Sequence, residues 1–87
     1  MKNLTWTRDE AYCCEETAHL GDFAAVIIPP NTAYNDDETW NIQIFDEGDE
    51  DAMECGETFL RIEGPTTRGL TVLLAETILK ELAGGRK

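Results

Sequence analysis

The order of sequence patterns predicts an α+β fold, in which an antiparallel sheet of four to five strands carries one C-terminal helix packed on one face. Short runs of β-branched and aromatic residues come first, turn-forming residues separate them, and one stretch of helical periodicity follows. The chain has 87 residues, which suffice for one modest core. We therefore expect residues 1–87 to form a single domain.

The first segments predict a hairpin. Residues 4–6 alternate in polarity and contain β-formers, so they predict a short first strand, and the polar residues 8–10 predict a turn. Residues 11–16 predict the returning strand, and residues 19–22 supply the chemistry of the next turn.

Three more strands are expected after that turn. The apolar run Phe23–Ile28 predicts a central strand that is buried on both faces, and the prolines after it end the strand because proline cannot donate to a sheet ladder. Residues 40–44 alternate cleanly, so their three apolar side chains share one face. Residues 58–62 predict the last strand, in which Leu60 and Ile62, or else Phe59, turn inward.

Helical spacing marks the end of the chain. A threonine at 66 or 67 is expected to cap the helix, and Gly84–Gly85 to end it. Glu76, Lys80 and Glu81 are expected on the wetter side. The apolar stripe consists of Val72, Ala75, Ile78, Leu79 and Leu82.

Negative charge is the most informative feature for function. The formal net charge is -11, from 18 acidic and 7 basic residues. Seven of the twelve residues in 46–57 are carboxylates and none is basic, and a smaller acidic cluster lies at 36–38. So many like charges raise the free energy of the compact state, so such a surplus serves either solubility alone or a cationic partner.

Charge and hydropathy also argue against several classes of protein. The longest apolar run, 23–28, is too short to cross a bilayer, and the N-terminus does not have the pattern of a signal peptide. An acidic surface is repelled by anionic lipid and by nucleic acid, so we expect no membrane and no direct nucleic-acid binding. The odd set Cys13, Cys14 and Cys55 argues against a disulfide scaffold and favours free thiols in a reducing cytoplasm.

Catalytic and metal-binding patterns are weak. The chain has no serine, and no phosphate-binding glycine loop is present, so we expect a protein that is not an enzyme and needs no cofactor. The acidic run does not fit the ligand spacing of a calcium loop, whether the loop is taken to start at Asp46 or at Asp49. His19 with the three cysteines lacks the closely spaced ligand pairs of a zinc site. A small metal-binding protein that uses the acidic loop or the thiols stays an alternative.

The acidic segments have a geometric likeness to nucleic acid. DNA carries about one negative charge per 1.7 Å of helix axis, and carboxylates on one side of an extended segment recur at roughly 6.6 Å, twice the rise of a strand residue. Tyr34, beside the smaller cluster, is a candidate aromatic contact for arginine. The alternative is a solvated loop that only keeps the protein soluble. The candidate acidic contacts are Asp36, Asp37, Glu38, Asp46, Glu47, Asp49, Glu50, Asp51, Glu54 and Glu57.

In size, acidity and the order of short strands before one helix, the chain resembles small phage-encoded inhibitors of host defence, such as anti-CRISPR proteins and DNA-mimic anti-restriction proteins. The resemblance implies a stoichiometric inhibitor in the host bacterial cytoplasm that occupies the basic nucleic-acid-binding groove of a defence effector and performs no chemistry. A second interpretation is a cytosolic adaptor or antitoxin-like protein that binds its partner through the helix or a sheet face.

Overall fold

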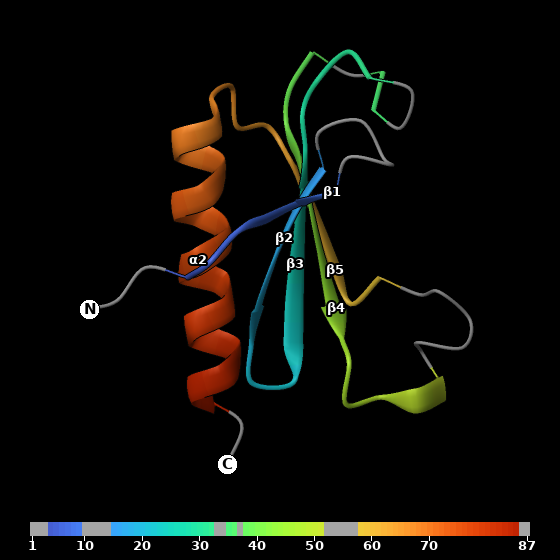
Figure 1. Ribbon diagram of the computed structural model, residues 1–87, viewed down its shortest axis with the longest axis vertical. Helices are drawn as coiled ribbons and strands as arrows, with labels where there is room; N and C mark the ends of the chain where they lie inside the picture. The colour runs from blue at the N-terminus through green and yellow to red at the C-terminus, as the bar shows by residue number, and fades with distance from the viewer. Residues whose placement is uncertain (1–3, 10–14, 33–34, 37, 52–57, 86–87) are drawn as a thin grey trace.

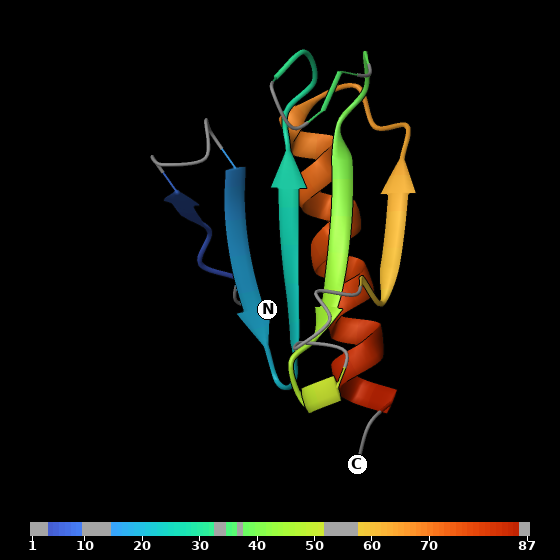
Figure 2. The same ribbon diagram turned by 90° about the vertical axis from the view of Figure 1, so that its right-hand side faces the viewer.

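The computed structural model describes residues 4–9, 15–32, 35–36, 38–51 and 58–85. A five-stranded antiparallel sheet and a long helix form two layers (Figures 1 and 2), which confirms the predicted α+β fold. The strands follow the order of the chain across the sheet, so each pairs with its neighbour in sequence. The elements are β1 (Thr7–Asp9), β2 (Glu15–Leu20), β3 (Phe23–Ile28), β4 (Asn41–Asp46), β5 (Leu60–Glu63) and α2 (Arg68–Gly85).

The core lies between the sheet and α2. Alternation along β3 and β4 directs Ala25, Ile27, Ile42 and Ile44 to the helix side, where each is completely buried. Leu79 is also completely buried on the facing side of α2. Burial of each such isoleucine or leucine contributes about 1.5–3 kcal/mol, so this layer is the main source of stability.

A tight turn joins β2 to β3. Leu20 pairs directly with Phe23, so only Gly21 and Asp22 lie between the strands. Gly21 has a φ of 61°, which suits the first central position of a type II′ turn, where glycine carries no steric penalty. The predicted turn was therefore too long, because His19 and Leu20 belong to β2.

The start of the chain differs from the expectation. Residues 4–6 precede the sheet, and the strand β1 occupies Thr7–Asp9, where a polar turn was expected. Leu4 and Trp6 are half-buried against the core from outside the sheet. The indole Nε1 of Trp6 and the amide of Leu4 donate to Glu76 Oε2 at 3.0 and 3.2 Å. Apolar residues of this segment are thus used to cover the helix flank, so they form no strand.

The remaining boundaries shift by a few residues. The strand expected at 11–16 begins at Glu15, and residues 10–14 lie outside the described part of the chain. The strand expected at 40–44 runs from Asn41 to Asp46, and the one expected at 58–62 runs from Leu60 to Glu63. Ile62 packs on the core, whereas Phe59 and Leu60 stay exposed at the sheet edge. Phe59 makes an edge-to-face contact with Phe23 across a ring-centroid distance of 5.6 Å.

The predicted N-cap of the helix is confirmed, but one residue of the helix, Glu76, was assigned to the wrong side. The hydroxyl of Thr67 accepts the amide of Leu70 at 3.2 Å, which is the N-cap bond. The helix runs from Arg68 to Gly85, so the two glycines that were expected to end it lie in its last turn. Glu76 was expected on the wetter side, yet it is 7% exposed, because its carboxylate accepts the two bonds from the N-terminal segment.

An ion pair between an exposed arginine and a buried glutamate links the helix start to the sheet. Arg68 donates from Nε to Glu16 Oε2 at 2.8 Å and from Nη2 to Oε1 at 2.6 Å. The bonds from Arg68 hold the pKa of Glu16 below its ordinary value of 4.5, with a smaller contribution from Arg8 on the neighbouring strand, although burial opposes them. Over the described residues, we find no helix with the length and apolarity that crossing a membrane requires.

Candidate acidic docking surface

The two acidic segments lie at opposite ends of the sheet. In the antiparallel register of β3 and β4, Ile28 pairs with Asn41 at one end and Phe23 with Asp46 at the other. The loop with Asp36 and Glu38 follows the first end, and the run that starts at Asp46 follows the second (Figure 2). Strands of this length span about 17–20 Å. The two segments, which were grouped as one set of candidate acidic contacts, therefore do not form one continuous array.

The longer run does not continue as an extended segment. Asp46 is 8% exposed, and its Oδ1 accepts the amide of Gly48 at 3.0 Å. The amide of Asp49 then donates to the carbonyl of Asp46 at 3.2 Å, which closes a turn. Glu50 and Asp51 have helical backbone geometry. The strand spacing expected for the carboxylates does not apply here, because the chain folds back on itself and gathers them.

One further carboxylate joins this run from the neighbouring hairpin. The amide of Glu47 donates to the carbonyl of Asp22 at 2.7 Å, so the β2–β3 turn and the turn after β4 lie side by side. Asp22 is exposed. Sequence reasoning assigned Asp22 to the turn and missed it as a surface residue. The sequence could have indicated this position, since the turn after β2 and the turn after β4 must lie at the same end of an antiparallel sheet.

We call this surface the acidic end, and each of its side chains is exposed. It combines the tip of one hairpin with the turn that follows β4, so two sequence segments supply its charge. The residues of the acidic end are Asp22, Glu47, Asp49, Glu50 and Asp51.

A histidine lies at the border of the acidic end. His19 Nδ1 and Glu47 Oε1 are 2.8 Å apart, and both side chains are largely open to solvent, at 60% and 38% exposed. An exposed pair of this kind contributes at most about 1 kcal/mol to stability. His19 therefore orients one carboxylate without enclosing it.

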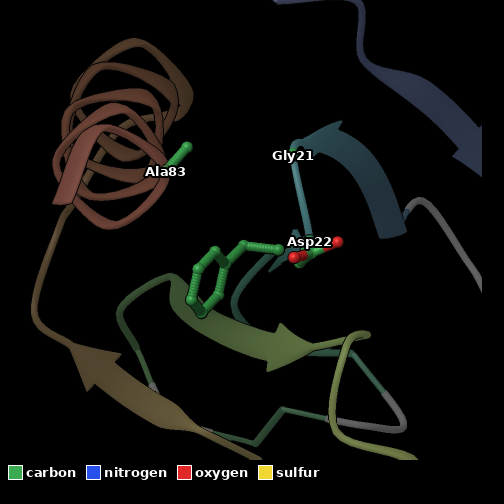
Figure 3. A pocket seen from close by; sticks show the side chains of 4 residues that line it. Gly21, Asp22 and Ala83 are labelled. Carbon is green, nitrogen blue, oxygen red and sulfur yellow. The ribbon is translucent and has the colours of Figure 1, made fainter. Parts of the chain in front are cut away.

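The end of α2 adds to the negative field. The helix finishes beside the β2–β3 turn, where Ala83 faces Gly21 across a hollow of about 100 Å³ (Figure 3). A Cβ on Gly21 would lie 3.5 Å from the Cβ of Ala83, which measures how closely the two elements approach. The C-terminus of a helix carries about half a negative charge from its unsatisfied carbonyls. Among the described residues, the carbonyls at the end of α2 and the carboxylates of the two turns therefore carry charge of the same sign, and the basic residues Arg86 and Lys87 follow them in the sequence.

The other candidate contacts do not belong to the acidic end. Asp36 and Glu38 are exposed on the β3–β4 loop. The buried side chain of Asn35 organises that loop by donating to the carbonyls of Ile28, Pro29 and Thr39 at 3.3, 3.2 and 2.8 Å. Sequence reasoning did not single out Asn35. The candidates Tyr34, Asp37, Glu54 and Glu57 lie outside the described residues.

A search of the described residues for metal centres finds no group of three or more His, Cys, Asp and Glu side chains arranged to hold an ion. Comparison of the chain with models of protein families, with curated proteins and with solved structures gave no match.

Proposed function

We propose that the protein is a non-enzymatic inhibitor that binds the basic nucleic-acid groove of another protein through its acidic end. The supporting observation is the gathering of five exposed carboxylates at one end of the sheet, from two hairpin turns, in a chain with a net charge of -11. Grooves built for phosphates present arginine and lysine side chains, and carboxylates can take the place of the phosphate oxygens.

The shape of the acidic end supports the same function. The Asp22 turn and the run after β4 are joined by a backbone hydrogen bond, so the main chain that carries their carboxylates is already ordered before binding. The hollow beside them has Phe23 and Ala83 among its lining residues. Arginine and lysine bury their aliphatic stems against apolar surface while their charged ends stay with carboxylates, so this hollow suits such a side chain.

The finer proposal is an inhibitor of the phage type that acts in the bacterial cytoplasm on a defence nuclease. Long-range attraction between a strongly acidic protein and a basic groove speeds association and makes affinity depend steeply on salt. An inhibitor of this kind competes with DNA and needs no cofactor.

The test uses two probes: an RNA-guided nuclease loaded with its guide, and a restriction endonuclease. Each is assayed for cleavage of its own DNA with increasing amounts of the protein. We expect stoichiometric inhibition of one probe, which weakens when salt is raised or when the enzyme is first bound to DNA. Inhibition of neither probe, or inhibition that does not depend on salt, contradicts the proposal.

Two matched variants locate the contact. Asp49→Lys with Asp51→Lys reverses two charges at the acidic end, and Asp36→Lys with Glu38→Lys reverses two at the opposite end of the sheet. Both pairs change the net charge equally, so a purely global effect of charge would weaken them alike. We expect the first pair to lose inhibition and the second to keep most of it. Normal inhibition by the first pair would place the contact elsewhere.

A further inference from the structure

A recess lies between the N-terminal segment and the first half of α2. The N-terminal segment crosses the helix (Figure 1), and the bonds from Leu4 and Trp6 to Glu76 hold it in place. The recess has a volume of about 340 Å³, which lies at the small end of the range of ligand pockets, roughly 300–1,000 Å³. We call it the α2 recess, and its lining includes Trp6, Arg68, Val72, Leu73 and Glu76.

Glu76 brings a buried carboxylate to the α2 recess without a cation to balance it. The residue is 7% exposed. Its Oε2 accepts the bonds from the indole of Trp6 and the amide of Leu4, whereas Oε1 accepts no hydrogen bond within the described part of the chain. None of the ion pairs in that part of the chain includes Glu76. Because buried charges in proteins are as a rule paired with an opposite charge, Oε1 suits a cationic group that comes from outside the chain.

Arg68 supplies a positive charge to the same recess. It opens α2 and Glu76 lies eight residues later, so their Cα atoms are about 12 Å apart along the helix axis. Nε and Nη2 of Arg68 bind Glu16, and Nη1 has no partner among the described residues. The side chain is 53% exposed, so an anionic group can reach Nη1 from solvent.

The wall between the two charges is apolar and partly open. Gly69, Val72 and Leu73 share one helix face with Glu76, because they follow the spacing i, i+3, i+4 and i+7. Val72 is half-buried and Leu73 is 63% exposed. A Cβ at Gly69 would contact no neighbouring group within 4 Å, so the missing side chain leaves this part of the recess open. A short chain of methylene groups suits this wall, since it would bury apolar surface there.

We propose that the α2 recess binds a small zwitterion in which an aliphatic stem joins an ammonium group to a carboxylate. The ammonium group donates to Oε1 of Glu76, the stem lies along Val72 and Leu73, and the carboxylate accepts from Nη1 of Arg68. A zwitterion has no net charge, so the net charge of -11 neither attracts nor repels it at long range. Binding here therefore depends little on salt, in contrast to binding of a basic partner at the acidic end.

An NMR titration with ε-aminocaproate tests the proposal, and the indole N–H signal of Trp6 reports on the site because it is bonded to Glu76. We expect a Kd on the order of 1 mM, since few atoms make contact. Caproate lacks the ammonium group and should bind about tenfold more weakly or worse, because the carboxylate that it leaves unpaired is buried. Hexylamine lacks the carboxylate and should lose at most about fivefold, because Arg68 is exposed. No shift of the indole signal with ε-aminocaproate, or equal binding of caproate, overturns the proposal.

Two variants with matched controls test the location. Gly69→Leu fills the recess and should abolish binding without lowering the melting temperature, because leucine favours a helix more than glycine does. Gly84→Leu makes the same change in the last turn of α2 and should bind normally. Glu76→Gln keeps an oxygen for the two N–H donors but removes the charge, so binding should weaken about tenfold or more. Glu81→Gln, on the exposed side of α2, removes the same charge and should have little effect. Normal binding by a folded Gly69→Leu variant, or by Glu76→Gln, refutes the assignment of the site.

Discussion

The ion pair between Arg68 and Glu16 gives the sharpest test of how the helix is fixed to the sheet. The change is a double-mutant cycle of Arg68→Met, Glu16→Gln and the two together, which measures the part of the coupling that depends on the carboxylate charge, since glutamine keeps one acceptor oxygen. A hydrogen bond to a charged group contributes about 1.5–3 kcal/mol when it is protected from water. The Arg68 side chain is 53% exposed and the Glu16 side chain 10% exposed. Solvent screening lowers the total, so we expect a coupling of about 1–2 kcal/mol.

The coupling should depend on pH in a defined direction. The hydrogen bonds from Arg68 hold the pKa of Glu16 below 4.5 in the folded protein. The unfolded chain therefore takes up the proton first as the pH falls. Stabilisation by the pair is fully present above about pH 4.5 and is lost as the pH falls through the lower pKa of the folded state.

Urea unfolding followed by circular dichroism measures the coupling at pH 7 and at about pH 2. For a domain of this size, each kcal/mol also shifts the melting temperature by roughly 4–8 °C. We expect Arg68→Met to be more destabilising than Glu16→Gln at pH 7, because it leaves a carboxylate buried without its partner. A coupling near zero at pH 7, or one that is equal at both pH values, would show that the pair does not fix the helix as the geometry indicates.

Two further predictions concern the core and the N-terminal segment. Leu79→Ala removes a completely buried side chain and should lower the free energy of unfolding, measured by urea titration, by about 2–5 kcal/mol. Leu60→Ala, at the exposed edge of the sheet, should lower it much less. Equal losses for the two variants would mean that the core is placed wrongly. Trp6→Phe removes the indole donor to Glu76 and should cost about 1–3 kcal/mol. Much of this loss should disappear when Glu76→Met has already removed the acceptor, and additive losses in thermal melts would argue against the bond.

The fold could be predicted from the sequence where one pattern had a single physical explanation. Phe23–Ile28 is an unbroken apolar run because the central strand is buried on both faces, and its bounds were correct. The stripe of α2 was correct because helical spacing leaves one face for the core. Thr67 was identified as an N-cap candidate because its side chain is of the type that satisfies a free helix amide.

Features that depend on contacts between distant segments could not be predicted in this way. Glu76 has the sequence pattern of an exposed helix residue, and only the folded chain brings the indole of Trp6, 70 residues away, to its carboxylate. Leu4 and Trp6 predict a strand or a packing segment equally well, so the position of β1 was wrong. The separation of the acidic segments, by contrast, follows from the predicted topology itself, since consecutive loops of an antiparallel meander lie at opposite ends.

The meander order of the strands has a consequence for synthesis on the ribosome. All five strands emerge before α2, so the hairpins can pair locally while Ile27, Ile42 and Ile44 still face water. Until the last turn of α2 leaves the ribosome, the nascent sheet exposes its apolar face to other proteins in the cell. Repulsion between the negative net charges of neighbouring chains opposes aggregation during that interval. The carboxylates that we propose for binding therefore also keep the nascent chain from aggregating.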